Sequence, residues 1–295
     1  MKVGLIGCVD SSEMALKTLL SIDGLDVAAV VTREQSAVNA DFCDLSKICK
    51  VNQIPYHFEN PKERYLSIEF LQKYDLDVVY CVGWSYLLNE DLLSLPRMGV
   101  IGFHPAKLPQ NRGRHPIIWA LALGLEETAS TFFKMDTGAD SGPILSQVNI
   151  TIDSSDNAKS LYAKILNVAE VQIKKISLDL MRGSAVFKEQ DHMKATYWRK
   201  RSRKDGNIDF RMTAEGIHDL VRALAPPYPC AEFLLVDEYI LVPKSTLVLT
   251  EFPQNIEPGK VLDKSDDGIL VKTHNKSAIW LQGFDTEKIE IGQFL

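Results

Sequence analysis

The chain has 295 residues, of which 45% are hydrophobic and 24% are charged, a balance typical of a globular protein with one large core and a smaller second one. Its net charge of −6 disfavours a general nucleic-acid binder, and its five scattered cysteines, with no C-x-x-C pair, disfavour a disulfide framework or a zinc knuckle. No apolar segment approaches the length of a membrane span, so we expect a cytoplasmic protein without a membrane partner.

The N-terminal part of the chain alternates apolar runs with helical patterns. Apolar runs predict strands at residues 3–6, 27–31, 54–56, 77–82 and 99–103. Helical patterns fill the intervals at residues 14–20, 41–51, 68–73 and 87–95. This alternation predicts a Rossmann-like α/β fold with a mainly parallel sheet that is covered on both faces. The first turn lacks G-x-G-x-x-G, so a dinucleotide site is not supported.

The second half of the chain changes in character. After a helix at 117–123, two strands at 128–135 and 144–152 flank a loop, and a long helix is expected at 158–180. A basic run at residues 195–204 comes next, followed by a helix at 213–224 that is capped by Thr213. Short alternating segments between 231 and 281 predict a small, barrel-like β domain. We therefore predict two domains, residues 1–190 and 191–295.

His104 is the first candidate for chemistry, because it directly follows a predicted buried strand. Ligands of parallel sheets bind at the carboxyl ends of the strands, which is where Cys8, Trp84 and His104 all fall. An imidazole in such a place suits a general base. A structural histidine explains the position alone equally well.

Asp140 is the second candidate, and it lies in a loop between Gly138 and Gly142. A carboxylate beside His104 would fix the imidazole tautomer and stabilise the imidazolium, although an ordinary turn aspartate explains the residue alone better. The sequence contains no Gly-x-Ser-x-Gly motif and no metal-ligand spacing around its other histidines. The chemistry that these residues favour is direct acyl transfer to an amine, without a covalent intermediate or a metal.

The run Gly102-Phe103-His104-Pro105, the Arg112-Gly113-Arg114 segment and the spacing to Asp140 resemble the formyltransferase fold. That family uses 10-formyltetrahydrofolate and includes methionyl-tRNA and nucleotide-sugar formyltransferases. Its signature is Asn-x-His at a strand end with a distant Asp. The resemblance covers nearly the whole chain, and it implies that His104 and Asp140 are catalytic and that a homodimer is possible.

Several stretches resemble the sugar-modifying branch, which implies a role in lipopolysaccharide or O-antigen sugar biosynthesis. The resemblance implies acyl-donor contacts from Gly83, Trp84, Ser85, Leu87, Leu88, Arg112 and Gly113. For a UDP- or dTDP-linked amino sugar it implies Cys8, Asp10, Ser11, Lys107, Trp198, Arg199, Arg201, Arg222 and Tyr228. Cationic side chains can neutralise a pyrophosphate and an aromatic ring can stack on a base, whereas a solvated linker is the alternative interpretation of the basic run.

The sequence departs from the family pattern at Gly102, which stands where the family has the asparagine. That amide helps to hold the carbonyl oxygen, and losing one such donor commonly costs about 10²–10³ in rate. Because glycine would also leave room for an acetyl methyl group, we interpret Gly102 as favouring N-acetyl transfer from acetyl-CoA, with His104 as the base.

Three alternatives to this interpretation stay open. The first is N-formyl transfer from 10-formyltetrahydrofolate to a nucleotide-linked amino sugar. The second is formylation of methionyl-tRNA, which the acidic charge disfavours because tRNA binding draws on many phosphate contacts. The third is an inactive module that binds a nucleotide sugar.

Overall fold

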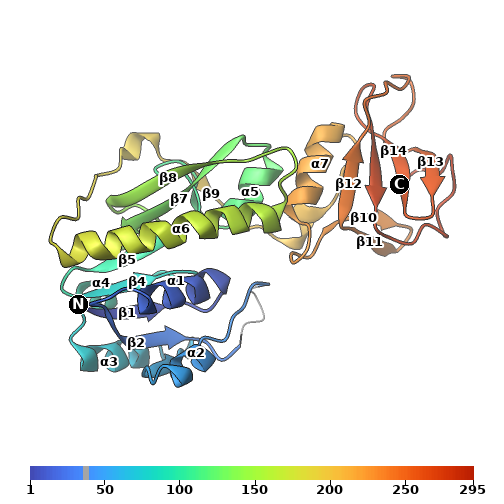
Figure 1. Cartoon of the computed structure of the whole chain (residues 1–295). Coiled ribbons are helices and arrows are strands. Elements are labelled where there is room, and N and C mark those ends of the chain that lie inside the picture. The colour runs from blue at the N-terminus through green and yellow to red at the C-terminus, as the bar shows by residue number, and fades with distance from the viewer. Residues whose placement is uncertain (36–39) are drawn as a thin grey trace. The chain divides into compact units, whose positions relative to one another are not determined.

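The computed structural model describes residues 1–35 and 40–295, and the chain folds into two compact units (Figure 1). The first unit contains Met1–Gly113, Ala129–Ile150 and Lys164–Trp198, and the second contains Arg114–Thr128, Thr151–Ala163 and Arg199–Leu295. A single boundary at residue 190 does not describe these units, because two segments before that residue, Arg114–Thr128 and Thr151–Ala163, belong to the second one. Within the described ranges, no helix is both long enough and apolar enough to cross a membrane.

A seven-stranded sheet in the order β3-β2-β1-β4-β5-β7-β8 forms the centre of the first unit. Its strands are β1 (Lys2–Ile6), β2 (Asp26–Thr32), β3 (Tyr56–Phe58), β4 (Val78–Cys81), β5 (Val100–His104), β7 (Glu127–Lys134) and β8 (Ile144–Thr151). The first five pair in parallel, and β7 joins β5 in the antiparallel sense. The prediction of a mainly parallel sheet is therefore confirmed.

Helices cover both faces of this sheet, as predicted. Leu5 of β1 packs in one core cluster with residues of α1 (Asp10–Leu20), α2 (Ser46–Val51) and α6 (Ala158–Met181). The next residue, Ile6, packs in the other cluster with residues of α3 (Tyr65–Leu71) and α4 (Glu90–Ser94). Successive side chains of a strand point to opposite faces, so one buried strand contributes to both clusters.

Two helices are shorter than their patterns predict. The backbone of residues 41 and 43 bonds with that of Cys8 and Asp10, so α2 begins only at Ser46, whose N–H donates to the Asp44 carboxylate. Similarly, α4 begins at Glu90 because the Asn89 side chain caps it by accepting from the Leu92 N–H. Tertiary pairing and a cap therefore set boundaries that hydrophobic periodicity alone does not.

The second unit is β-rich, as predicted. It contains α5 (Pro116–Ala122) and α7 (Ala214–Ala223), and the side chain of Thr213 caps α7 by accepting from the Gly216 N–H at 3.1 Å. Its strands are β10 (Ala231–Leu235), β11 (Glu238–Val242), β12 (Lys244–Leu247), β13 (Val261–Ser265), β14 (Gly268–Lys272) and β15 (Ala278–Gln282). These described strands form an antiparallel sheet in the order β12-β15-β14-β13 and a separate β10-β11 hairpin instead of one closed barrel.

His218 of α7 predicts a pH dependence of stability. Burial, with a contribution from Arg222, lowers the pKa of His218 below its ordinary value of 6.5. The unfolded chain then binds a proton more readily, so this stability is complete above the unfolded pKa and is lost as the pH falls toward the folded pKa. We expect Tm to decrease between about pH 7.5 and about pH 5.5, and to decrease less in His218→Gln. Equal slopes in wild type, His218→Gln and a control variant of the exposed His274 would contradict this expectation.

Candidate functional site

The carboxyl end of β5 places His104 inside the first unit, where the residue is only 4% exposed. Its Nε2 lies 2.7 Å from the backbone carbonyl oxygen of Asn111. Because a carbonyl oxygen can only accept, we assign the proton of the neutral ring to Nε2. The lone pair then resides on Nδ1, which faces the Asp140 Oδ2 at 3.6 Å.

Asp140 is held in the left-handed region with a φ of 53°, which few residues other than glycine adopt. Its Oδ2 accepts a hydrogen bond of 2.8 Å from the backbone N–H of Gly113. The structure thus brings His104, Asp140 and Gly113 together from three separate stretches of sequence. The juxtaposition of the histidine and the aspartate agrees with the expectation from the sequence.

Gly102 does not open room beside His104, and this expectation from the sequence is wrong. Strand alternation places Gly102 on the same face of β5 as His104. A Cβ at this glycine would lie 2.7 Å from Met135 Cγ and 3.0 Å from Phe133 Cζ. The volume that a larger side chain would occupy is therefore filled by Met135 and Phe133, so an acetyl methyl group gains no space here.

The loop after β4 carries the residues that were predicted to meet the acyl donor. Gly83 has a φ of 68°, and a Cβ there would lie 2.2 Å from Val9 Cγ2, so this turn requires glycine. The Trp84 and Tyr86 rings make an edge contact, and the Arg33 guanidinium lies over both, at 5.0 and 4.4 Å from their centroids. Cation–π contacts of this kind fix the loop against β2.

The remaining residues of this loop differ in their exposure. Leu87 is 61% exposed, whereas Ser85 and Leu88 are half-buried. The Arg33 Nε is buried and has no acceptor among the residues that the structure describes. Leu87 thus presents an exposed apolar side chain in the loop that also carries the Trp84 and Tyr86 rings, which suits the apolar face of a heterocycle.

Arg112 does not have the placement that a donor-binding residue needs. It is 1% exposed, and its guanidinium donates to Gln190 Oε1 and to the Tyr197 hydroxyl and lies 3.1 Å from His192 Nδ1. Tyr197 also pairs with Arg112 between the short strands β6 (Arg112–Gly113) and β9 (Tyr197–Trp198). The predicted contact between Arg112 and an acyl donor is corrected accordingly, because its donors are already directed into the protein.

Four of the residues predicted to bind a nucleotide sugar lie in the first unit near the ends of β1 and β5. Cys8 and Ser11 are buried, and the Cys8 Sγ lies 3.9 Å from the Gly83 carbonyl oxygen. Lys107 is half-buried in the loop after β5. Asp10 begins α1, where burial and the nearby Asp41 raise its pKa, and with Glu13 it places carboxyl groups instead of cations at this helix end. Asp10 is therefore a poor candidate for contact with a diphosphate.

Trp198 is the fifth of these residues in the first unit and lies against Gly113. It ends β9, and its carbonyl oxygen would be only 2.3 Å from a Cβ at Gly113, which has a φ of 105°. Gly113 is therefore required both for its backbone angle and for the close approach of Trp198. The hydrogen bond from the Gly113 N–H to the Asp140 carboxylate therefore depends on a glycine at this position.

In the second unit, the Trp119 ring contacts two arginines of the basic run. The guanidinium groups of Arg199 and Arg201 lie 5.3 and 4.6 Å from the Trp119 ring centroid, and the Trp119 indole N–H donates to the Arg199 carbonyl. Arg199 also pairs with Asp205, which holds the pKa of that carboxyl well below its usual range. Burial lowers the pKa of Arg201, whose side chain donates to the Asp205 carbonyl. Sequence reasoning missed Trp119 because its apolar helical context is typical of a core residue.

The last two predicted residues of the nucleotide-sugar site have different placements. Arg222 donates to the Asp219 carboxylate and to the carbonyls of Asp153 and Asp156, and its side chain is 12% exposed. It joins α7 to the turn before α6, so the predicted contact with a nucleotide does not fit this placement. Tyr228 is half-buried in the turn that follows the cis peptide bond between Pro226 and Pro227.

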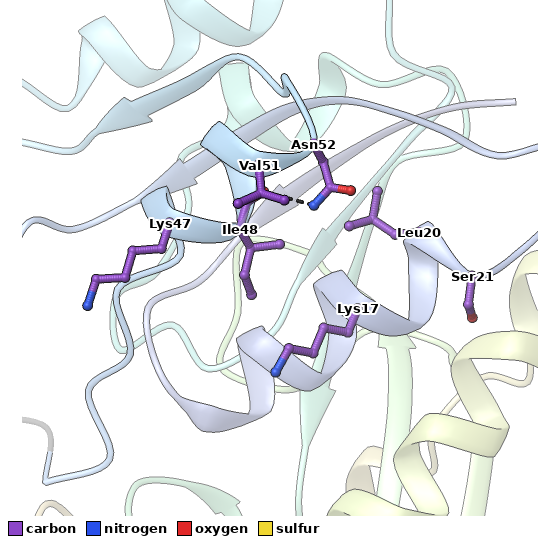
Figure 2. Close-up of a pocket in the computed structure, with 7 residues that line it drawn as sticks. All are labelled: Lys17, Leu20, Ser21, Lys47, Ile48, Val51 and Asn52. Carbon is purple, nitrogen blue, oxygen red and sulfur yellow. Dashed lines mark hydrogen bonds between the residues drawn. The ribbon is translucent and has the colours of Figure 1, made fainter.

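A surface groove between α1 and α2 has a volume of about 510 Å³, and its ionisable side chains are two lysines (Figure 2). Its lining consists of Lys17, Leu20, Ser21, Lys47, Ile48, Val51 and Asn52. None of the predicted site residues is among them. Over the described ranges, no three or more His, Cys, Asp or Glu side chains are grouped so that they could hold a metal ion.

Comparisons with known proteins place this geometry in a family. Residues 12–175 match the model of a formyl transferase, and residues 200–294 match that of the formyl transferase C-terminal domain. The chain is 29% identical over 265 residues to the bifunctional polymyxin resistance protein ArnA of Wigglesworthia glossinidia brevipalpis. This alignment covers 89% of the chain but only 40% of the relative, so the chain spans well under half of that protein's length.

Two solved structures share the fold over nearly the whole chain. One is WlaRD, a sugar 3N-formyl transferase solved in the presence of dTDP and 5-N-formyl-THF, with a TM-score of 0.70, 18% identity, and coverage of 98% of this chain and 99% of that chain. The other is an N-formyltransferase from Helicobacter canadensis in complex with folinic acid and dTDP-3-aminofucose, with a TM-score of 0.72, 17% identity, and coverage of 96% and 100%.

The names of these proteins refer to formyl transfer, and the predicted preference for acetyl-CoA finds no support in them. The match of both domain models, over residues 12–175 and 200–294, agrees with a parallel-sheet unit, whose strand β5 ends at His104, and a β-rich region that follows it. The chain therefore belongs to the formyl transferase family.

Proposed function

We propose that the protein transfers a formyl group from 10-formyltetrahydrofolate to the amine of a nucleotide-linked amino sugar. The observation that carries this proposal is the His104–Asp140 pair, with 3.6 Å between Nδ1 and Oδ2, in a chain that belongs to the formyl transferase family. The similar structures WlaRD and the Helicobacter canadensis enzyme support it, because their names join a formyl folate with a dTDP nucleotide or dTDP-sugar. A role in lipopolysaccharide or O-antigen sugar biosynthesis remains part of the proposal, as the resemblance to the sugar-modifying branch implies.

His104 acts as the general base in this proposal, through Nδ1. Its Nε2 proton is committed to the Asn111 carbonyl, so the lone pair of Nδ1 is the one that can accept the proton lost by the sugar amine as the new N–C bond forms. The imidazolium then carries protons on both nitrogens, and it returns the proton from Nδ1 to N10 of the folate as the bond between N10 and the formyl carbon breaks. Asp140 stabilises that cation, and the Gly113 N–H keeps the carboxylate oriented toward it.

The loop 83–88 holds the donor in this proposal. Trp84 and the exposed Leu87 would border its heterocycle, with Gly83, Ser85 and Leu88 shaping the turn. When bound, the folate supplies a formyl carbonyl that is activated toward an amine. The protein's own contribution is to keep this loop rigid, which the Arg33 contacts with Trp84 and Tyr86 provide.

Arg199 and Arg201 remain proposed contacts of the nucleotide diphosphate, because guanidinium groups are of the kind that bind phosphates. Cys8, Ser11, Lys107, Trp198 and Tyr228 remain proposed contacts of the sugar or nucleotide. A homodimer also remains a prediction.

The proposal is tested by offering the purified protein dTDP- and UDP-linked amino sugars with 10-formyltetrahydrofolate or acetyl-CoA in separate reactions. We expect a product with the mass of the N-formyl sugar in the folate reactions and no N-acetyl product above the background without enzyme. Acetyl product without formyl product would contradict the proposal. Binding of the amino sugar without product from either donor would favour a binding module instead.

A further inference from the structure

Gln190 lies between the buried Arg112 and the loop that carries Asp140. Its Nε2 donates to the carbonyl oxygens of Asp140 at 2.9 Å and of Gly142 at 2.6 Å. Its Oε1 accepts from the guanidinium of Arg112 at 2.7 and 3.3 Å. Gln190 is 6% exposed, so all of these bonds are shielded from water.

The orientation of the Gln190 amide follows from its partners. A guanidinium has only donors, so it requires the amide oxygen on its side, and the two backbone carbonyls only accept, so they require the NH₂ group. Arg112 in turn is fixed by the Tyr197 hydroxyl, which accepts from it at 2.8 Å. If the amide were flipped, its NH₂ group would face the guanidinium donors and its oxygen would face the two carbonyl oxygens. The hydrogen bonds therefore fix a single orientation of the Gln190 amide.

The same network joins the two loops that meet at His104. Asn111, whose carbonyl accepts from the imidazole, and Gly113, whose N–H donates to Asp140, flank Arg112 in the chain. Gln190 bonds the carbonyls of Asp140 and Gly142 and so spans the turn in which Asp140 has a positive φ. Such a backbone angle persists only where the surroundings hold it.

We propose that Gln190 is a positioning residue, which uses the orientation imposed by Arg112 to hold Asp140 in place for His104. This inference rests on the proposed function for its kinetic consequence only. Removing the Gln190 amide should let the 136–142 turn relax, so that the Asp140 carboxylate moves away from His104 and from the Gly113 N–H. The cation formed on His104 then loses its partner in the transition state.

The Gly113 amide reports this movement without any substrate. Glycine follows arginine only at Gly113 and Gly183 in this sequence, so after labelling with ¹³C-carbonyl arginine and ¹⁵N-glycine an amide spectrum filtered through the ¹³C carbonyl contains two signals. Gly183 donates to the Leu180 carbonyl and serves as an internal reference. In Gln190→Met we expect the Gly113 proton signal to move upfield, because its bond to a carboxylate is lost, while the Gly183 signal stays in place.

Two further variants separate positioning from a general loss of packing. Gln190→Glu still accepts from Arg112 but cannot donate to the carbonyls, so it should move the Gly113 signal as Gln190→Met does. Gln172→Met removes another buried glutamine, 4% exposed, which donates to the Ser130 carbonyl and the Ser146 hydroxyl. It should lower Tm comparably and leave the Gly113 signal unchanged.

The kinetic expectation is a decrease in kcat of about 10–100-fold in Gln190→Met and Gln190→Glu, with KM nearly unchanged. A Gly113 signal that keeps its wild-type position in both Gln190 variants overturns the proposal. An inactive wild-type protein would count against the proposed function alone, because the glycine signals still show whether Gln190 positions Asp140.

Discussion

The His104→Gln variant is expected to lose about 10²–10⁴-fold in kcat, with KM for the nucleotide sugar nearly unchanged. Glutamine can still donate to the Asn111 carbonyl in place of Nε2. It has no basic lone pair to replace Nδ1, which faces Asp140. The amine would then have to lose its proton to water, and the cation that Asp140 stabilises could not form.

A steady-state comparison of three proteins checks this expectation. His218→Gln, from α7, is the matched control, since it removes a half-buried histidine that is bonded to Ser245 and not to the candidate site. It should keep its kcat at neutral pH. If His104→Gln retained kcat within about threefold of wild type, His104 would not be the general base.

The second large effect concerns Gly102, where introducing the family's asparagine should damage the protein. The new Cβ would lie 2.7 Å from Met135 Cγ and 3.0 Å from Phe133 Cζ. Overpacking of this kind typically costs about 1–3 kcal/mol in the free energy of unfolding. We therefore expect Gly102→Asn alone to be less stable than wild type and no faster.

Shortening Met135 should relieve that clash, because its half-buried side chain occupies the place of the missing one. In Gly102→Asn/Met135→Ala the amide can extend alongside His104, and we expect stability to recover and kcat to exceed that of Gly102→Asn by about 10-fold or more. A double-mutant cycle by urea unfolding measures the coupling, which should be about 1 kcal/mol or larger. Additive free energies would show that Met135 does not occupy this place.

The parallel sheet was predictable because it depends on local apolar patterns, whereas the pairing of His104 with Asp140 was implied by the resemblance to the formyltransferase fold. The apolar run of β5 ends at His104, and the glycines around Asp140 indicate a loop with unusual backbone angles. Trp119 and Gln190 were not predictable, because their partners come from distant segments and a helical tryptophan or a linker glutamine has no local signature.

The space around Gly102 could not be predicted from the sequence. Its lack of a side chain suggested empty space, but the amount of space depends on Met135, a residue of another strand end that pairing with β5 brings alongside. Arg112 and Arg222 were misjudged for a related reason. Both are cations in a basic context, and only the fold shows that their donors are satisfied by the protein itself.

The central claim is tested most directly by the mass of the product formed when 10-formyltetrahydrofolate and acetyl-CoA compete in one reaction with a nucleotide-linked amino sugar. We predict the N-formyl sugar with wild-type protein and its near absence with Asp140→Asn, since the asparagine cannot stabilise the His104 imidazolium. An N-acetyl product from wild type, or equal N-formyl yield from Asp140→Asn, would contradict the account.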